Sequence, residues 1–170
     1  MGLHPGATWP AKMWPSEPFA ELAKMLAEKL GAQVLITQGP KDAEVAQDVA
    51  RKAGGAAKII GVLPLRQLAA ILVHCSVYVA NDSAPMHIAV AVNTPTIGIF
   101  GPGEENVWFP YHPPFYENSA GHIALRKDVF CHPCHLNVCN REGNGYMECM
   151  KLLTAGEVFD EVRKRLALKR

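Results

Sequence analysis

The residues with the clearest chemical potential lie in a short polar turn at residues 81–83, between an apolar strand at 77–80 and an apolar helix at 86–92. Asp82 and Ser83 have the short polar side chains that favour a helix start. The first turn of such a helix presents free backbone N–H groups and the positive end of the helix dipole. The turn is therefore predicted to bind an anion such as phosphate.

His87 strengthens this interpretation. It follows Ser83 by one helical turn, so its imidazole is expected on the same rim as the capping groups. Capping alone is the more common role of an Asp-Ser pair before a helix. A helix start combined with a histidine favours a binding site instead.

A second group of polar residues lies in the loop at residues 5–15, which follows a short strand at 2–4. Gly6 allows close approach of the backbone, Thr8 offers a hydroxyl, and Lys12 supplies a mobile positive charge. Together these residues could clamp a polyphosphate.

A third group is an array of four cysteines, C-x2-C-x4-C-x9-C, within a loop at residues 126–150: Cys131, Cys134, Cys139 and Cys149. Four soft ligands could hold a structural zinc ion. Reduced thiols that simply pack the loop are an equally good interpretation. Disulfides and an iron–sulfur cluster are less favoured.

Size and composition limit the possible classes of protein. The sequence has 170 residues, of which 49% are hydrophobic and 19% charged, which indicates one globular domain. A net charge of +1 gives no general attraction to nucleic acid or to an anionic membrane. The sequence shows no apolar run of membrane-spanning length and no signal peptide, so a cytoplasmic location is expected.

The elements that must position these residues alternate between strand and helix. Strands are predicted at 2–4, 33–37, 58–60, 77–80 and 96–100, and helices at 16–30, 42–53, 65–74, 86–92 and about 154–168. We expect Ser16 to cap the first helix, and Thr154 and Glu157 to form a capping box on the last. Residues 103–121 are expected to form a long loop. This alternation predicts an α/β fold, with a Rossmann-like parallel sheet covered by helices on both faces.

Ligands of such sheets bind beyond the carboxyl ends of the strands. The residues expected to face that edge are Thr8, Lys12, Gly39, Glu44, Asp82, Ser83, His87 and Gly101. The sequence has neither a G-x-G-x-x-G motif after the first strand nor a P-loop, which disfavours a dinucleotide-dependent dehydrogenase.

Several of these motifs, in this order, resemble glycosyltransferase family 9, which contains the bacterial lipopolysaccharide heptosyltransferases. The similar stretches are LHPG at 3–6, KMWP at 12–15, NDSAPMH at 81–87, PTIGIFGP at 95–102, and the cysteine array with its final CMK at 149–151. The resemblance covers essentially the whole chain.

The resemblance implies one half of a two-domain GT-B enzyme. Residues 1–170 would be the C-terminal domain that binds the nucleotide sugar, and the N-terminal acceptor domain would be absent. The residues that would bind the donor are Thr8, Lys12, Glu44, Asp82, Ser83, Ala84 and His87. Asp42 is an alternative to Glu44 for the nucleoside. Ala84 stands where many members have glycine, and Ala7 where some have a hydroxyl residue.

The resemblance also implies an inverting transfer of heptose from ADP-heptose to a glycolipid, in synthesis of the lipopolysaccharide core or a related glycan. The general base would belong to the absent domain, so we expect no catalytic residue in this chain and no transfer by it alone. Transfer would require no cofactor, although the cysteines could hold a structural zinc. The enzyme would contact the membrane only peripherally, at the inner face of the inner membrane.

Two other functions remain open from the sequence. The first is a zinc-stabilised, Rossmann-like binding or assembly module without transferase activity, which would contain metal and fail to bind nucleotide sugars. The second is a sugar-nucleotide epimerase of the GT-B type, which the order of the motifs disfavours.

Overall fold

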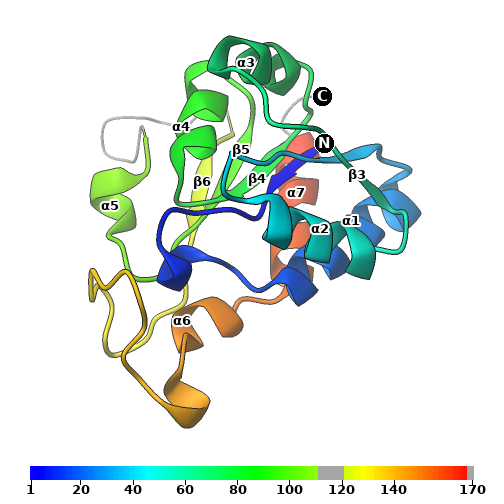
Figure 1. Cartoon of the computed structure of the whole chain (residues 1–170). Coiled ribbons are helices and arrows are strands. Elements are labelled where there is room, and N and C mark those ends of the chain that lie inside the picture. The colour runs from blue at the N-terminus through cyan, green and yellow to red at the C-terminus, as the bar shows by residue number, and fades with distance from the viewer. Residues whose placement is uncertain (111–120, 168–170) are drawn as a thin grey trace.

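A computed structural model of the chain describes residues 1–110 and 121–167. Within these ranges the core is one parallel sheet of six strands in the order β3-β2-β1-β4-β5-β6 (Figure 1). The strands are β1 (Gly2–His4), β2 (Val34–Ile36), β3 (Ala57–Ile59), β4 (Tyr78–Asn81), β5 (Thr96–Ile99) and β6 (Ile123–Leu125). The order reverses between β1 and β4, which is where doubly wound sheets bind their ligands.

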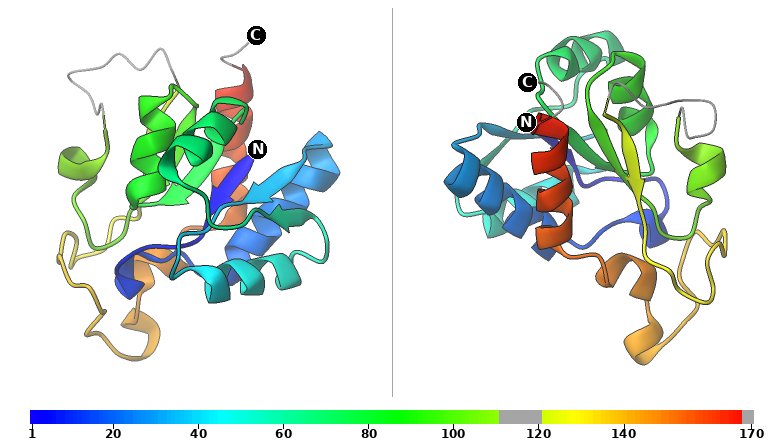
Figure 2. Two further views of the ribbon diagram at one scale, coloured as in Figure 1. Left: turned by 45° about the horizontal axis from the view of Figure 1, so that its top comes forward. Right: turned by 180° about the vertical axis from the view of Figure 1, so that it is seen from behind.

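Helices cover both faces of the sheet, as the two turned views show (Figure 2). One face carries α1 (Ser16–Leu30), α2 (Ala43–Lys52) and α7 (Ala155–Ala167). The other carries α3 (Leu65–Val73) and α4 (Ala84–Ala91). The short elements are η1 (Pro10–Lys12), α5 (Glu105–Trp108), η2 (Gly143–Gly145) and α6 (Glu148–Lys151). Among the described residues, none of these helices combines the length and the apolar character needed to cross a bilayer.

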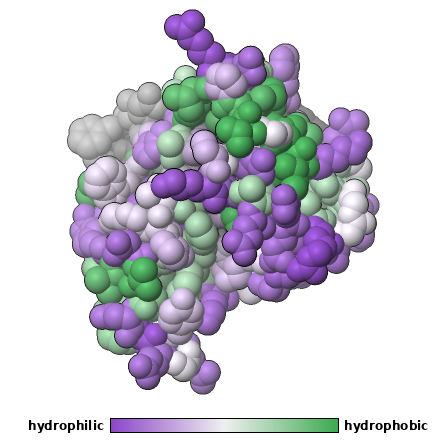
Figure 3. Space-filling model, viewed as in Figure 1, coloured by the Kyte–Doolittle hydropathy of each residue, from purple (hydrophilic) through white to green (hydrophobic). Residues whose placement is uncertain are grey.

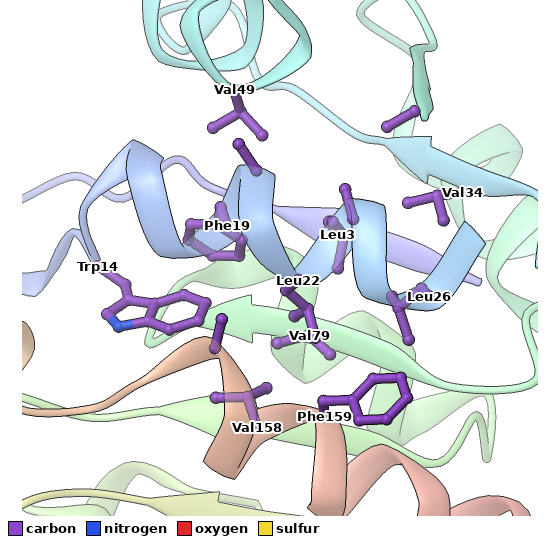
Figure 4. Close-up of a cluster of buried hydrophobic side chains, with 14 of the residues drawn as sticks. Leu3, Trp14, Phe19, Leu22, Leu26, Val34, Val49, Val79, Val158 and Phe159 are labelled. Atoms are coloured by element: carbon purple, nitrogen blue, oxygen red, sulfur yellow. The ribbon is translucent and has the colours of Figure 1, made fainter. Parts of the chain in front are cut away.

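The larger hydrophobic core lies between the sheet and the layer of α1, α2 and α7 (Figure 4). Leu3 of β1 and Val79 of β4 point into it from the sheet, and Leu22 meets them from α1. The indole of Trp14 packs edge-on against Phe19 with 4.8 Å between ring centroids. This core anchors the end of the loop that follows β1.

A smaller core fills the space between the sheet and α3 and α4. Tyr78 of β4 and Met86 of α4 are fully buried in it. A Cβ atom on Gly98 would come within 2.7 Å of the Met86 sulfur and 2.8 Å of the Phe109 ring. Glycine at this position of β5 therefore leaves room for the Met86 and Phe109 side chains, which a larger residue would force to shift.

The predicted fold class is confirmed, and each predicted strand and helix has a counterpart in the structure. The sixth strand, β6, was missed, because its three residues carry no alternation of their own. The expected loop at 103–121 contains α5, and its residues 111–120 lie outside the described ranges.

One of the two expected helix caps is present in the structure and the other is not. The capping box is confirmed, with the Glu157 carboxylate accepting from the Thr154 N–H at 2.9 Å and the Thr154 hydroxyl accepting from the Glu157 N–H at 3.2 Å. The expected cap at Ser16 is wrong. Helix α1 already includes Ser16, whose hydroxyl instead donates to the Asp48 carboxylate of α2.

We expect Leu22→Ala to destabilise the fold by about 2–5 kcal/mol, because Leu22 is fully buried in the larger core and truncation leaves a cavity. Urea denaturation followed by circular dichroism measures this loss. Leu30→Ala is the matched control on the same helix. Leu30 is partly exposed, so the control should cost about 1 kcal/mol or less. Equal losses in the two variants would contradict the described packing of α1.

Candidate functional site

The amide of Asn81, at the carboxyl end of β4, holds the loop after β1 in place. Asn81 is fully buried. Its Oδ1 accepts from the Trp14 N–H at 3.1 Å, and its Nδ2 donates to the Pro5 carbonyl at 2.8 Å. Both ends of the loop are thereby tied to β4 at the switch point of the sheet.

This tie brings Lys12 next to Asp82. The Lys12 Nζ lies 2.5 Å from Asp82 Oδ2, and the Asp82 side chain is almost fully buried. The ammonium also lies over the Trp9 ring, 4.5 Å from its centroid, in a cation–π contact. A Cβ atom on Gly103 would come within 3.1 Å of Asp82 Oδ2, so the turn after β5 packs closely against the pair.

A cavity of about 480 Å³ opens beside this pair, at the carboxyl ends of β1 and β2 and the start of α4. Such a volume is typical of a site for a small ligand. Its lining residues come from four segments: His4, Ala7, Thr8, Thr37, Gln38, Gly39, Pro40, Lys41, Asp42, Val62, Leu63, Pro64, Leu65, Leu68, Ser83, Ala84 and Pro85.

A buried polar network forms the base of the cavity. The Nδ1 of His4 donates to the Thr37 carbonyl at 3.1 Å, and the Thr37 and Tyr78 hydroxyls are 2.6 Å apart. Burial lowers the pKa of His4, and the neighbouring Asp42 carboxylate only partly opposes this shift. Burial also raises the pKa of Tyr78. The network therefore presents neutral groups at the base of the cavity.

Asp42 brings a carboxylate to the cavity wall. It accepts a hydrogen bond from the Gly39 N–H at 2.8 Å, and its Oδ2 lies 3.7 Å from His4 Nε2. A Cβ atom on Gly6 would come within 2.3 Å of the Asp42 Cγ. Glycine at position 6 thus leaves room for the carboxylate between the loops after β1 and β2.

The structure brings most of the predicted site residues together. Thr8, Ser83 and Ala84 line the cavity, and the pair of Lys12 and Asp82 stands beside it. Two predicted residues, Glu44 and His87, are exposed and lie outside the cavity lining.

Helix capping by Asp82 and Ser83, the alternative that the sequence offered to a binding site, is not what their side chains do. Ser83 occupies the N-cap position of α4, but its hydroxyl donates to the Asn81 carbonyl at 3.0 Å, and Asp82 pairs with Lys12 instead. Four polar residues of the cavity lining were missed by the sequence analysis: His4, Thr37, Gln38 and Lys41. His4 and Thr37 sit in or next to apolar strands, where a pattern of hydrophobicity gives no sign of a ligand cavity.

We call Cys131, Cys134, Cys139 and Cys149 the cysteine quartet; all four are free thiols that line one small cavity of about 20 Å³. Burial, followed by the neighbouring thiols, raises the pKa of Cys149 to about 11. In the described part of the chain, no three His, Cys, Asp or Glu side chains already stand as a ready-made metal site.

Comparison with known proteins shows to which family the chain belongs. The sequence model of glycosyltransferase family 9 (heptosyltransferase) matches residues 1–135. The chain belongs to glycosyltransferase family 9. The matched range contains every residue that lines the 480 Å³ cavity, and it ends between Cys134 and Cys139.

Curated members of family 9 are similar over part of their length. Lipopolysaccharide heptosyltransferase 2 of Escherichia coli K12 is 34% identical over 108 residues, which are 60% of this chain and 31% of that protein. Lipooligosaccharide heptosyltransferase 2 of Campylobacter jejuni (strain 81116) is 27% identical over 170 residues, 96% of this chain and 50% of that protein. The match thus spans 31% to 50% of the length of these relatives.

Solved structures of family 9 share the fold. An E. coli ADP-heptose lipopolysaccharide heptosyltransferase II superposes with a TM-score of 0.75 at 26% identity, covering 99% of this chain and 46% of that one. A family 9 glycosyltransferase from Veillonella parvula gives a TM-score of 0.76 at 27% identity, with 98% and 45% covered. The fold described above is therefore that of one half of a GT-B heptosyltransferase.

The lowered pKa of His4 predicts that the fold loses stability in mild acid. The unfolded chain, in which His4 has its ordinary pKa of 6.5, binds a proton more readily than the folded chain. The free energy of unfolding should therefore fall as the pH drops below about 6.5, and level off once the folded imidazole also titrates. Urea denaturation at a series of pH values measures this slope.

The substitution His4→Gln should flatten the slope. Part of it should remain, because burial also lowers the pKa of His122. A slope identical in the two proteins would contradict a neutral, buried His4.

Proposed function

We propose that this chain is the donor-binding half of an inverting glycosyltransferase that uses a nucleotide sugar, ADP-heptose, in synthesis of the lipopolysaccharide core or a related glycan. The observation that carries the proposal is the cavity at the switch point of the sheet, with Lys12 beside the first turn of α4. A cation, free backbone N–H groups and a helix dipole then converge where a diphosphate would lie.

The diphosphate would lie against Ser83, Ala84 and Lys12. No side-chain cap competes with a ligand for the Ala84 N–H at the start of α4, since the Ser83 hydroxyl points to Asn81 instead. Thr8, which is exposed at the rim, can donate its hydroxyl. The net charge of the chain is only +1, so recognition of the anion must come from these local groups.

The nucleoside would fill the other end of the cavity. Leu63, Pro64 and Leu65 supply apolar surface for a base, and the hydrophobic surface over α3 and the segment before it is visible in Figure 3. The Asp42 carboxylate can accept hydrogen bonds from ribose hydroxyls. Because Asp42 lines the cavity and Glu44 does not, we assign this role to Asp42.

The sugar would lie toward Asp82 and His87. Asp82 orients the Lys12 ammonium and can accept from sugar hydroxyls, and His87 is exposed one turn further along α4. In the reaction the acceptor hydroxyl attacks the anomeric carbon, the bond to the diphosphate oxygen breaks, and the nucleoside diphosphate leaves. Lys12 and the α4 N-terminus stabilise the developing negative charge, so the proposed step needs no cofactor.

The remaining parts of the reaction would come from outside these 170 residues. We propose that an acceptor-binding half supplies the glycolipid site, the general base that takes the hydroxyl proton, and any peripheral contact with the inner face of the inner membrane. The names of the similar proteins support the proposed donor and product class, since the E. coli structure is described as an ADP-heptose lipopolysaccharide heptosyltransferase. The 170-residue chain alone should bind the donor without transferring its sugar.

Isothermal titration of the chain with ADP tests the proposal. We expect saturable binding of ADP that is tighter than binding of UDP or GDP. Lys12→Met should weaken it by about 10- to 100-fold, because a charged hydrogen bond to phosphate is worth about 1.5–3 kcal/mol.

Lys24→Met, at an exposed lysine on α1, is the matched control and should leave the affinity for ADP unchanged. Failure of ADP to bind, or equal losses in the two lysine variants, would refute the proposed diphosphate site.

A pair of carboxylate variants tests where the ribose lies. Asp42→Asn removes the charge from the cavity wall and should weaken ADP binding by about tenfold. Glu44→Gln makes the same chemical change two residues away, outside the cavity, and should alter the affinity less than about twofold. The opposite ranking in the same titration would move the ribose to Glu44.

A further inference from the structure

The cysteine quartet lies in a segment with little regular structure. Between β6 and α6 the chain contains only the short turn η2 and otherwise irregular backbone. Phe130 and Val138 in this segment are largely exposed. The segment therefore has few buried apolar contacts to fix its shape, and small modules of this kind depend on a cross-link or a metal.

The four thiols converge although nothing in this backbone requires it. They come from four positions spread over 19 residues, yet all line the same cavity, together with Ala11 and Pro102. The Met147 N–H donates to Cys139 Sγ at 3.3 Å, and the Arg141 guanidinium lies 3.9 Å from Cys131 Sγ. Two polar donors therefore point at sulfur atoms of the quartet.

The cavity adjoins the two turns that flank the proposed donor site. The Ala11 N–H donates to the Asn137 carbonyl at 3.1 Å, which ties the turn that carries Lys12 to the cysteine segment. The His135 N–H donates to the Pro102 carbonyl at 2.9 Å, which ties down the turn after β5. Figures 1 and 2 show the yellow-to-orange segment beside the blue turn η1.

We propose that the cysteine quartet binds one zinc ion, and that this metal fixes the cysteine segment so that it holds Lys12 in position for the donor. Zinc accepts four thiolates in a closed tetrahedral site, and its binding free energy becomes folding free energy for the segment around it. The thiols line the cavity without yet forming a ligand set, so they must close around the ion as it binds. The zinc site is argued from the cysteines alone, whereas its effect on Lys12 rests on the proposed donor site.

The consequence for the donor site is preorganisation. Lys12 is a long side chain whose turn is held by Asn81 on one side and by the cysteine segment on the other. Loss of the metal would release the second of these restraints. Binding of a nucleotide would then have to order the turn as well as contact it, which lowers the affinity.

Elemental analysis tests the metal site without reference to activity. We expect about one zinc per chain in protein purified under reducing conditions, as a single site with four cysteine ligands requires. Cys134→Ser and Cys139→Ser should each lose most of it. Cys75→Ser is the matched control, because Cys75 is buried near Gly2, at the opposite end of β1 from the cysteine segment, and this variant should keep its zinc.

Metal-free protein with four titratable thiols, or with disulfides among them, would overturn the site. Iron in the same stoichiometry, lost in the same variants, would keep the site and overturn the choice of zinc. Removing the metal from the wild-type protein with 1,10-phenanthroline gives a test that does not depend on how a variant folds.

The link to the donor site is tested by titrating ADP into the native, metal-stripped and zinc-reloaded protein. Stripping should weaken binding by about three- to tenfold, the cost of ordering one long side chain, and zinc should restore it. An unchanged affinity would overturn the link but not the metal site. Zinc retained by a chain that binds no nucleotide would refute the donor site and leave the metal site intact.

Discussion

The buried amide of Asn81 is the interaction on which the rest of the site depends. It joins the end of β4 to both ends of the loop after β1, across the point where the strand order reverses. An amide suits this place because it accepts and donates at once, and so satisfies an N–H and a carbonyl that would otherwise be buried without partners. This tie holds the turn that carries Lys12 at the end of β4, where the ammonium pairs with Asp82.

Charge in the site is arranged locally. The chain as a whole is almost neutral, so the proposed donor site must attract an anion through local groups such as Lys12 and the start of α4. Asp82 balances the charge of Lys12 and keeps its ammonium at the carboxyl end of β4. Burial keeps His4 neutral beneath the cavity, so the floor of the cavity adds no charge that would compete with Lys12. The cavity thus has apolar residues in its lining and the Lys12 ammonium beside it, as the proposed donor site requires.

The class of fold and most of the site could be predicted from the sequence. Alternating apolar strands and capped helices fix the class of fold, and the ends of parallel strands share one edge. Thr8, Lys12, Asp82 and Ser83 were placed at that edge for this reason. The assignment of Glu44 over Asp42 could not be settled, because two residues at a helix start differ by about 200° in direction, and loop geometry decides which one faces the cavity. His4 was not predicted as a site residue, because it lies in an apolar strand. The convergence of the cysteines depends on turns that no local pattern specifies.

A crystal structure of the chain with ADP tests the central claim most directly. The account predicts the diphosphate between Lys12 and the backbone N–H groups of Ser83 and Ala84, with the ribose against Asp42 and the base over Leu63 and Leu65. Well-ordered ADP bound elsewhere on the chain, with the Lys12 and Asp82 pair untouched, would contradict it.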